Sequence, residues 1–131
     1  MAKRITIFDT TLRDGTQGEG VQVAVEDKLR LTRIFDEVGF DFIEAGWPGS
    51  NPRDAEFFER ARTHRFLKSK LVAFGATRRA GVDCEEDMSL QALIRSGVPA
   101  VAVFGKSSGF QAEKVLQITR DENLEMIHDT L

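Results

Sequence analysis

The sequence predicts an α/β protein of four consecutive βα units with a parallel sheet, as in half of a (β/α)8 barrel. Two observations carry this prediction. Short apolar runs alternate with segments of helical periodicity, and the runs begin about every 30 residues. Strands that alternate with helices pair in parallel through right-handed crossovers. A free-standing four-stranded doubly wound sheet would show the same periodicity, so the pattern leaves both architectures open.

The first unit starts with a β-branched and aromatic run at residues 5–8, which predicts a strand. The polar, glycine-rich stretch 9–20 follows as a loop. From Val25 onward, apolar residues recur at helical spacing with charged residues between them, and Gly39 lies where this helix should end. The apolar positions of the helix are Leu31, Ile34, Phe35 and Val38.

The second unit repeats this order. Its predicted strand covers residues 41–45, and its loop covers residues 46–50. Asn51 and Pro52 suit the N-cap and the first position of the following helix. The apolar residues of that helix are Phe57, Phe58 and Ala61.

The third unit has its predicted strand at residues 71–74 and its turn at residues 75–81. We expect Asp83 to cap the next helix and Gly97 to end it. Cys84 would then open the helix, and we interpret it as a structural residue. The apolar residues of the helix are Met88, Leu90, Leu93 and Ile94.

The fourth predicted strand covers residues 100–104, and a loop at 105–109 leads into helical sequence that runs to Leu131. Nothing after Thr119 resembles a natural end of a domain. We therefore expect residues 1–131 to be one partial barrel domain, interrupted before its second half.

Composition argues against several classes of function. Charged residues make up 30% of the chain, and the net charge of -3 gives no basic excess for nucleic acid. Charged residues interrupt the apolar run near the start, which argues against a signal peptide or a membrane span. The single cysteine fits a reducing compartment. We expect a cytoplasmic protein without nucleic-acid or membrane partners.

Catalytic residues are expected in the loops after the strands, because parallel α/β folds bind ligands at the carboxyl ends of their strands. The first of these loops contains Asp-Thr-Thr-Leu-Arg-Asp-Gly-Thr-Gln at residues 9–17. The carboxylate of Asp14 can bind a divalent cation, and the guanidinium of Arg13 can stabilise an oxygen that gains negative charge. The alternative is a surface ion pair in a turn.

Residues 9–17 resemble the signature of the DRE-TIM metallolyases, a family that includes isopropylmalate, homocitrate and citramalate synthases and hydroxymethylglutaryl-CoA lyase. The resemblance implies the amino-terminal half of a TIM (β/α)8 barrel. It also implies that Asp14 is a ligand of a catalytic divalent metal (Mg2+, Mn2+ or Zn2+) and that Arg13 stabilises an enolate or carbonyl oxygen. Gln17 matches the signature glutamine at the edge of that site.

The second loop extends the resemblance. Residues 43–52 are similar to the family segment in which a glutamate at the end of the second strand faces the metal site, and Glu44 matches this glutamate. By itself, a carboxylate at a strand end is more often a cap or a salt-bridge partner. Beside Arg13 and Asp14, Glu44 is expected to orient Arg13 or a metal-bound water.

Residues 46–52, 73–81 and 103–107 resemble the citramalate synthase branch of the family. This branch implies an acyltransferase that condenses pyruvate with acetyl-CoA as co-substrate, in isoleucine biosynthesis. Isopropylmalate or homocitrate synthesis, or cleavage as in the lyase, are alternatives, because the branches differ mainly in the pocket for the 2-oxo acid. A non-catalytic α/β binding module, with the same charged residues as a structural network, is the alternative from another class.

Other polar residues have weaker interpretations. Lys106, Arg78 or Arg79 could contact a CoA phosphate, although such residues more often belong to a solvated basic loop. The sequence Gly-Lys-Ser at 105–107 lacks the earlier glycine of a P-loop. His64 and His128 are expected to lie away from the strand ends and to bind no metal.

The sequence departs from the family in one respect. The metal site of the family also uses a His-x-His pair from a late strand, and residues 1–131 contain no such pair. We therefore expect the isolated chain to be inactive. A half-barrel also leaves sheet edges open, which favours a homo-oligomer or association with the missing half.

Overall fold

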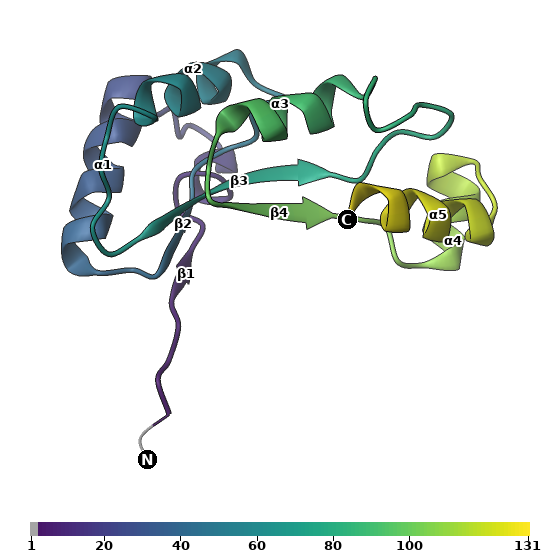
Figure 1. Cartoon of the computed structure of the whole chain (residues 1–131), viewed down its shortest axis with the longest axis horizontal. Coiled ribbons are helices and arrows are strands. Elements are labelled where there is room, and N and C mark those ends of the chain that lie inside the picture. Colours follow the sequence, from purple (N-terminus) through teal and green to yellow (C-terminus); the bar gives the residue numbers. More distant parts are fainter. Residues whose placement is uncertain (1–2) are drawn as a thin grey trace.

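The computed structural model describes residues 3–131 and contains one parallel sheet of four strands in the order β1-β2-β3-β4 (Figure 1). The strands pair in register through Phe8 with Phe42, Ile43 with Leu71, and Val72 with Ala100. The strands are β1 (Phe8–Asp9), β2 (Phe42–Glu44), β3 (Lys70–Ala76) and β4 (Ala100–Phe104).

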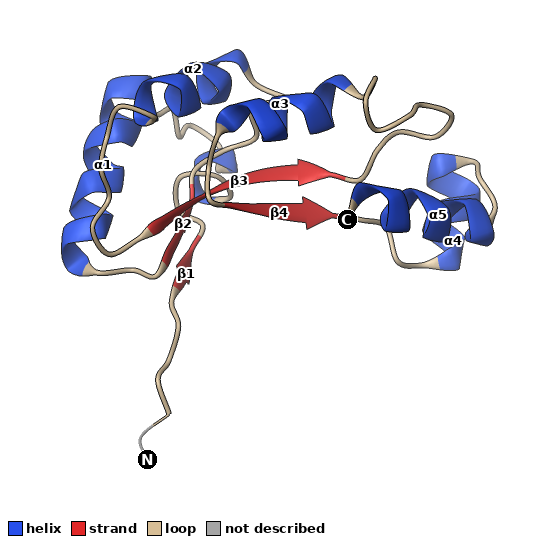
Figure 2. Ribbon diagram, in the orientation of Figure 1, coloured by secondary structure: helices blue, strands red, loops and turns tan. Residues whose placement is uncertain are grey.

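Three helices, α1 (Val25–Val38), α2 (Pro52–Ala61) and α3 (Met88–Ser96), lie together along one face of the sheet (Figure 2). A short 3-10 helix, η1 (Gly15–Gln17), lies in the first loop. Beyond the carboxyl ends of β3 and β4 lie α4 (Gly109–Gln111), the π-helical turn η2 (Ala112–Leu116) and α5 (Arg120–Thr130) (Figure 1). Among the described residues, no helix has both the length and the apolar character needed to cross a bilayer.

This arrangement is half of a (β/α)8 barrel, as the sequence predicted. Each strand pairs with its neighbour in the sequence, and α1 to α3 cover the same face. A doubly wound sheet would reverse its strand order at a switch point and place helices on both faces. The side of the sheet opposite α1 to α3 therefore corresponds to the interior of a barrel.

The core lies between the sheet and α1 to α3. Strand residues Ile43, Leu71 and Ala73 are at most 5% exposed and pack against the helices. Phe57 and Phe58 of α2 are fully buried, with their rings edge to face at a centroid distance of 5.1 Å. Alternate strand residues thus point into this layer, and the residues between them point to the opposite face.

Several helix ends agree with the sequence. The side chain of Asn51 accepts a hydrogen bond from the backbone N–H of Arg53 and caps α2, and Pro52 is its first residue. Gly39 ends α1 in the left-handed conformation, with φ of 97°, and Gly97 ends α3 in the same way. These signals are local, so they could be recognised without tertiary information.

The predicted start of the third helix was wrong. Asp87, not Asp83, caps α3, because its carboxylate accepts hydrogen bonds from the backbone N–H groups of Ser89 and Leu90. Asp83 belongs to a separate turn, in which its carbonyl accepts the N–H of Asp87. Cys84 therefore lies in the loop before α3 rather than inside the helix.

The first and last predicted elements were also partly wrong. Of the run at residues 5–8, only Phe8 belongs to a strand, and the backbone N–H of Ile7 donates to the side chain of Asp41 at 3.0 Å instead of to a neighbouring strand. The helical sequence after residue 109 is interrupted at Gln117, which has φ of 58°. A new helix starts after Thr119, whose side chain accepts from the N–H of Glu122.

The buried side of α1 also differs from the apolar face expected for it. Leu31 and Phe35 pack against the core, whereas Ile34 and Val38 are 43% and 66% exposed. Three polar residues of α1 are buried instead, and their side chains are hydrogen-bonded: Lys28, Thr32 and Asp36.

Candidate functional site

The first loop folds into a tight turn that points Arg13 across the ends of the strands. The carbonyl of Thr10 accepts the backbone N–H groups of Arg13, Asp14 and Gly15 at 2.8 to 3.2 Å. Leu12, which precedes Arg13 in this turn, is 1% exposed and anchors the turn in the core. One side chain of this turn is thus buried, and the charged side chains next to it lie near the carboxyl ends of β1 and β2.

Arg13 bridges two carboxylates. Its Nε donates to Oε2 of Glu44 at 2.6 Å, and its Nη1 donates to Oδ1 of Asp14 at 2.9 Å. The side chain of Glu44 is 3% exposed, that of Arg13 18%, and that of Asp14 62%. The structure therefore brings together three of the residues that the sequence singled out, with the glutamate buried and the aspartate facing solvent.

Two aromatic rings complete the surroundings of Arg13. The carbon Cζ of its guanidinium lies 4.1 Å from the ring centroid of Phe74 on β3. The ring of Trp47 contacts Phe74 edge to face at 5.3 Å, and its Nε1 donates to Oγ of Ser89 at 3.1 Å. The guanidinium is thus bound by carboxylates at two nitrogens, and its carbon lies over an aromatic ring.

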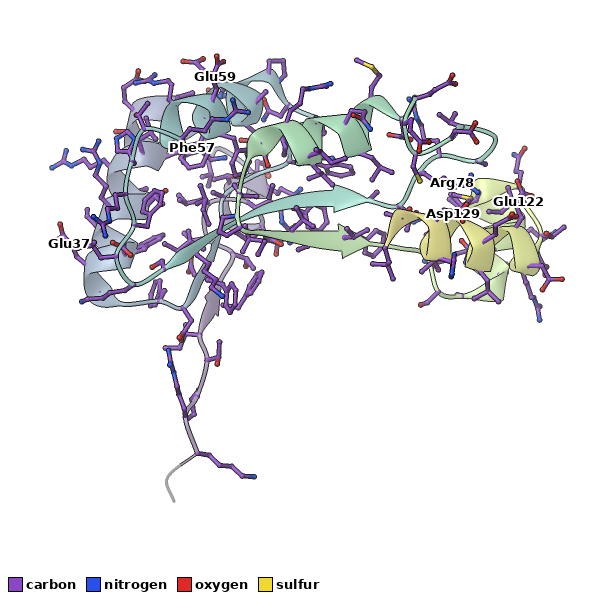
Figure 3. The ribbon with its side chains drawn as sticks, viewed as in Figure 1. Glu37, Phe57, Glu59, Arg78, Glu122 and Asp129 are labelled. Carbon is purple, nitrogen blue, oxygen red and sulfur yellow. The ribbon has the colours of Figure 1, made fainter. Side chains whose placement is uncertain are left out.

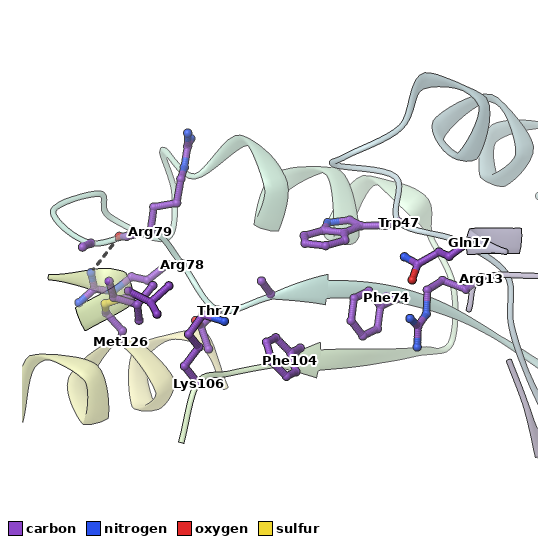
Figure 4. A pocket seen from close by; sticks show the side chains of 14 residues that line it. Arg13, Gln17, Trp47, Phe74, Thr77, Arg78, Arg79, Phe104, Lys106 and Met126 are labelled. Carbon is purple, nitrogen blue, oxygen red and sulfur yellow. Dashed lines mark hydrogen bonds between the residues drawn. The ribbon is translucent and has the colours of Figure 1, made fainter. Parts of the chain in front are cut away.

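A cavity of about 760 Å³ opens next to Arg13. This volume is within the usual range for small-molecule sites. In Figure 4, Arg13 and Gln17 lie near one end, and Arg78 and Arg79 lie near the other. The lining between the ends includes Trp47, Phe74, Thr77, Phe104 and Lys106. Of the residues predicted for the site, Arg13 and Gln17 line this cavity.

The turn after β2 is fixed by a buried ion pair. Lys28 of α1 pairs with Asp54 of α2, and its Nζ also donates to the carbonyl of Ala45 at 2.7 Å. The other oxygen of Asp54 accepts the N–H of Trp47 at 2.8 Å. Gly46 lies between these contacts with φ of 151°, and a Cβ there would collide with the Asp54 carboxylate. This turn needs glycine, and it holds Glu44 and Trp47 on either side.

The arginines at the far end of the cavity already have protein partners. Nε and Nη2 of Arg78 donate to one oxygen of Asp129 at 3.0 and 2.8 Å (Figure 3). This hydrogen bonding lowers the pKa of the Asp129 carboxyl. The side chain of Arg79 binds Asp87 at 3.3 Å. Lys106 is therefore the cavity's basic residue with no carboxylate partner among residues 3–131.

The carboxylate of Asp87 supports the loop beside the cavity. It accepts the backbone N–H of Arg79 at 2.9 Å in addition to the two N–H groups of α3. Burial disfavours its ionised form, but these hydrogen bonds outweigh burial and lower the pKa of Asp87. Cys84 in the same loop donates to the carbonyl of Asp129, and burial raises the pKa of its thiol.

The described residues fit one metal ligand rather than a complete metal site. Asp14 is exposed, and only its Oδ1 is hydrogen-bonded within the described part of the chain, to Arg13. No group of three histidine, cysteine or acidic side chains suited to a metal occurs within residues 3–131. His64 contacts Arg33 on the outer surface, and the His128 side chain is 89% exposed. Asp14 can therefore supply an oxygen, but further ligands would have to come from elsewhere.

The aromatic residues of the site were not predicted from the sequence. Phe74 belonged to a predicted strand, and the alternation of that strand is the signal that could have found it. Leu71 and Ala73 pack towards the helices, so Phe74 must face the barrel interior, where the site lies. Trp47 carried no comparable signal, because its place depends on contacts with α3.

Comparisons with known proteins agree with the fold. The HMGL-like family matches residues 4–131. An (R)-citramalate synthase from Streptomyces coelicolor is 51% identical over 126 residues, which are 95% of this chain and 24% of that protein. A 2-isopropylmalate synthase from Sulfurisphaera tokodaii is 30% identical over 99% of this chain and 32% of that protein. The crystal structure of hydroxymethylglutaryl-CoA lyase from Pseudomonas aeruginosa matches with a TM-score of 0.67 and 26% identity, over 95% of this chain and 40% of that one. The chain thus spans about a quarter of the length of the citramalate synthase it matches.

Proposed function

Because this chain belongs to the HMGL-like family, we propose that it forms the amino-terminal part of an (R)-citramalate synthase. In this proposal the enzyme condenses acetyl-CoA with pyruvate, and water then releases CoA from the thioester. The observation that carries the proposal is the Arg13 guanidinium, held by the buried Glu44 at the edge of the cavity. The identity of 51% with a citramalate synthase, against 30% with a 2-isopropylmalate synthase, favours pyruvate as the 2-oxo acid.

Arg13 is proposed to stabilise the charge that develops in the condensation. A base removes one proton from the acetyl methyl group, and the electron pair of the broken C–H bond forms the carbon–carbon bond to the ketone carbon. The electron pair of the C=O bond then moves to the ketone oxygen. The Nη2 of Arg13 has no hydrogen-bond partner among the described residues, whereas Nε and Nη1 are engaged. It can therefore donate to that oxygen as the negative charge appears.

The carboxylates have different proposed tasks. Glu44 keeps the Arg13 guanidinium in one orientation, because it is buried and bound to Nε. Asp14 contributes one oxygen ligand to a divalent metal, either Mg2+, Mn2+ or Zn2+. When bound, such a metal supplies Lewis-acid polarisation of the ketone. Gln17 lies exposed beside Arg13 and is proposed to contact substrate at the edge of the site.

The proposal places the protein among soluble biosynthetic enzymes. Its partners are small molecules, acetyl-CoA and a 2-oxo acid, and its product is a precursor of isoleucine in the cytoplasm. We also propose that the longer protein is a homo-oligomer. A 2-isopropylmalate synthase is the second candidate, because such enzymes match at 29% to 31% identity over nearly the whole chain.

The test is the release of CoA thiol from acetyl-CoA by the longer protein that carries this chain, with Mn2+ present. Pyruvate, 2-oxoisovalerate and 2-oxoglutarate are supplied in parallel reactions. The proposal predicts thiol release with pyruvate and its loss on substitution Asp14→Asn. Activity with 2-oxoisovalerate alone would support the second candidate. Activity with none of the acids, together with metal binding that Asp14→Asn leaves unchanged, would indicate a binding module with a structural ion-pair network.

A further inference from the structure

The Arg13 guanidinium lies over an aromatic ring that no sequence motif assigns to the site. Its Cζ lies 4.1 Å from the ring centroid of Phe74, within the range of a cation–π contact. We infer that Phe74 is a positioning residue for Arg13. This inference rests on the proposed function, because it concerns how the same guanidinium is held for the reaction.

The two carboxylates alone leave one movement of the guanidinium unopposed. Glu44 and Asp14 bind Nε and Nη1 through hydrogen bonds that lie near the plane of the group. Such bonds hold two nitrogens of the group, but they resist displacement of the group out of that plane only weakly. The guanidinium carbon lies over the ring of Phe74, and the ring prevents the group from moving towards β3.

Phe74 is itself held in place. Its backbone N–H donates to the carbonyl of Gly46 at 2.9 Å, and the edge-to-face contact with Trp47 fixes its ring. Trp47 is secured at both ends, through its backbone N–H to Asp54 and through its indole Nε1 to Ser89. A continuous set of contacts thus connects α3 and the buried Asp54 to the guanidinium of Arg13.

The consequence for catalysis follows from this geometry. A donor that stabilises a developing charge is effective only when it is already in place. Loss of the ring should therefore lower kcat more than it changes KM, because Arg13 keeps its charge and its carboxylate partners. The expected decrease for Phe74→Leu is about tenfold, from the usual strength of a partly desolvated cation–π contact.

The first test needs no enzymatic activity. In the 131-residue protein, an NMR spectrum of the arginine Nε–Hε groups should show the Arg13 proton shifted upfield by the ring current of Phe74. Phe74→Leu should remove this shift, Phe74→Tyr should keep it, and Phe104→Leu, which alters another ring of the same cavity, should leave it unchanged. An Arg13 signal that is the same in the wild type and in Phe74→Leu would overturn the inference. If the isolated protein gives no folded spectrum, the same four samples are compared in the longer protein with labelled arginine.

The second test is a double-mutant cycle in the longer enzyme. If Phe74 acts through Arg13, Phe74→Leu lowers kcat about tenfold in the wild type but by less than about twofold in an Arg13→Lys background. Phe74→Tyr should restore most of the rate. Equal losses in both backgrounds would show that Phe74 acts independently of Arg13 and would overturn the inference. An inactive wild type would count against the proposed function, while the NMR result would still decide the role of Phe74.

Discussion

The planar guanidinium of Arg13 meets three groups at once, two carboxylates and one aromatic ring. A lysine at this position would keep the positive charge but could not bind both carboxylates in a plane. We predict that Arg13→Lys in the longer enzyme lowers kcat by about 10²-fold or more, the usual effect of removing one donor to a developing oxyanion. Steady-state thiol release with pyruvate measures the change.

The matched control is Arg30→Lys, because Arg30 is an exposed arginine on α1 away from the cavity. Its kcat should stay within about twofold of the wild type, since surface substitutions have small effects. An Arg13→Lys enzyme as active as this control would contradict the role given to Arg13.

Arg13, Asp14 and Glu44 could be picked out from the sequence because each lies at the end of a predicted strand or in the loop after it. Arg13 and Asp14 come after the first apolar run, and Glu44 ends the second. Carboxyl ends of neighbouring parallel strands meet at one edge of the sheet, so proximity in space followed from the order of elements. The pairing of Arg78 with Asp129 was not predictable in this way, because it joins residues in loops and helices far apart in the sequence.

Helices α1 and α2 are joined to the end of β2 by the ion pair of Lys28 and Asp54, whose side chains are 5% and 12% exposed. Removing one partner of a buried pair leaves a charge without compensation. We predict that Lys28→Met lowers the free energy of unfolding by about 3 kcal/mol, because Asp54 would lose this partner. Urea denaturation at pH 7 measures the loss.

Arg60→Met on α2 serves as the comparison. Arg60 pairs with Glu26 and Glu56, but all three side chains are at least 38% exposed. Its substitution should lower the free energy of unfolding far less than Lys28→Met does, because exposed ion pairs contribute little to stability. If Lys28→Met cost no more than Arg60→Met, the pair would not be what fixes the turn after β2.

The segment between α2 and β3 is held to α1 by one carboxylate. Asp36 accepts the backbone N–H groups of Leu67, Lys68 and Ser69 at 2.7 to 2.9 Å. Burial disfavours its ionised form, but these three N–H groups outweigh burial and hold the pKa of Asp36 below its ordinary value. The folded state therefore binds fewer protons than the unfolded state when the pH falls.

This difference in pKa predicts a pH dependence of stability. The contribution of Asp36 is complete above its unfolded pKa of about 4 and is lost as the pH falls through the lower pKa of the folded state. Urea denaturation should show Asp36→Asn less stable than the wild type at pH 7, with the gap narrowing below about pH 4. Glu37→Gln, at the next and exposed position, should show no such gap. A gap for Asp36→Asn that stays constant down to acid pH would refute this account.

At the level of elements, local signals were sufficient for some helix ends and insufficient for others. Asn51 suits the N-cap and Pro52 suits the first position of a helix, so together they mark one starting point, and the start of α2 was predicted correctly. Asp83 and Asp87 are both plausible caps, and the choice falls on Asp87 because it also binds the backbone of Arg79 in the preceding loop. That contact forms only when the loop has folded, so it could not be predicted from the sequence.

The molecule as a whole exposes the side of the sheet that faces away from α1 to α3. Phe8 and Phe104, from the two edge strands, are 47% and 50% exposed.

Periodicity alone could not separate half of a barrel from a doubly wound sheet, because both alternate strands with helices. The distinction lies in the strand order and in the single helical layer, and these depend on which strands meet in space.

We predict that the 131-residue protein alone does not turn over acetyl-CoA and pyruvate. Its described residues supply one exposed metal ligand and no group of three. Thiol release with Mn2+ measures this, and the longer protein serves as the positive control. Turnover by the 131-residue protein that is lost on Asp14→Asn would show that a complete site forms within this chain.

A chimera tests whether this chain is the amino-terminal part of a citramalate synthase. This chain replaces the matching residues of the (R)-citramalate synthase from Streptomyces coelicolor, with which it shares 51% identity over 126 residues. Citramalate formation from acetyl-CoA and pyruvate is then measured for the chimera and for its Arg13→Lys variant. The chimera should form citramalate, and its Arg13→Lys variant should lose this activity by about 10²-fold or more. A folded chimera that forms no citramalate, or a variant as active as its parent, would contradict it.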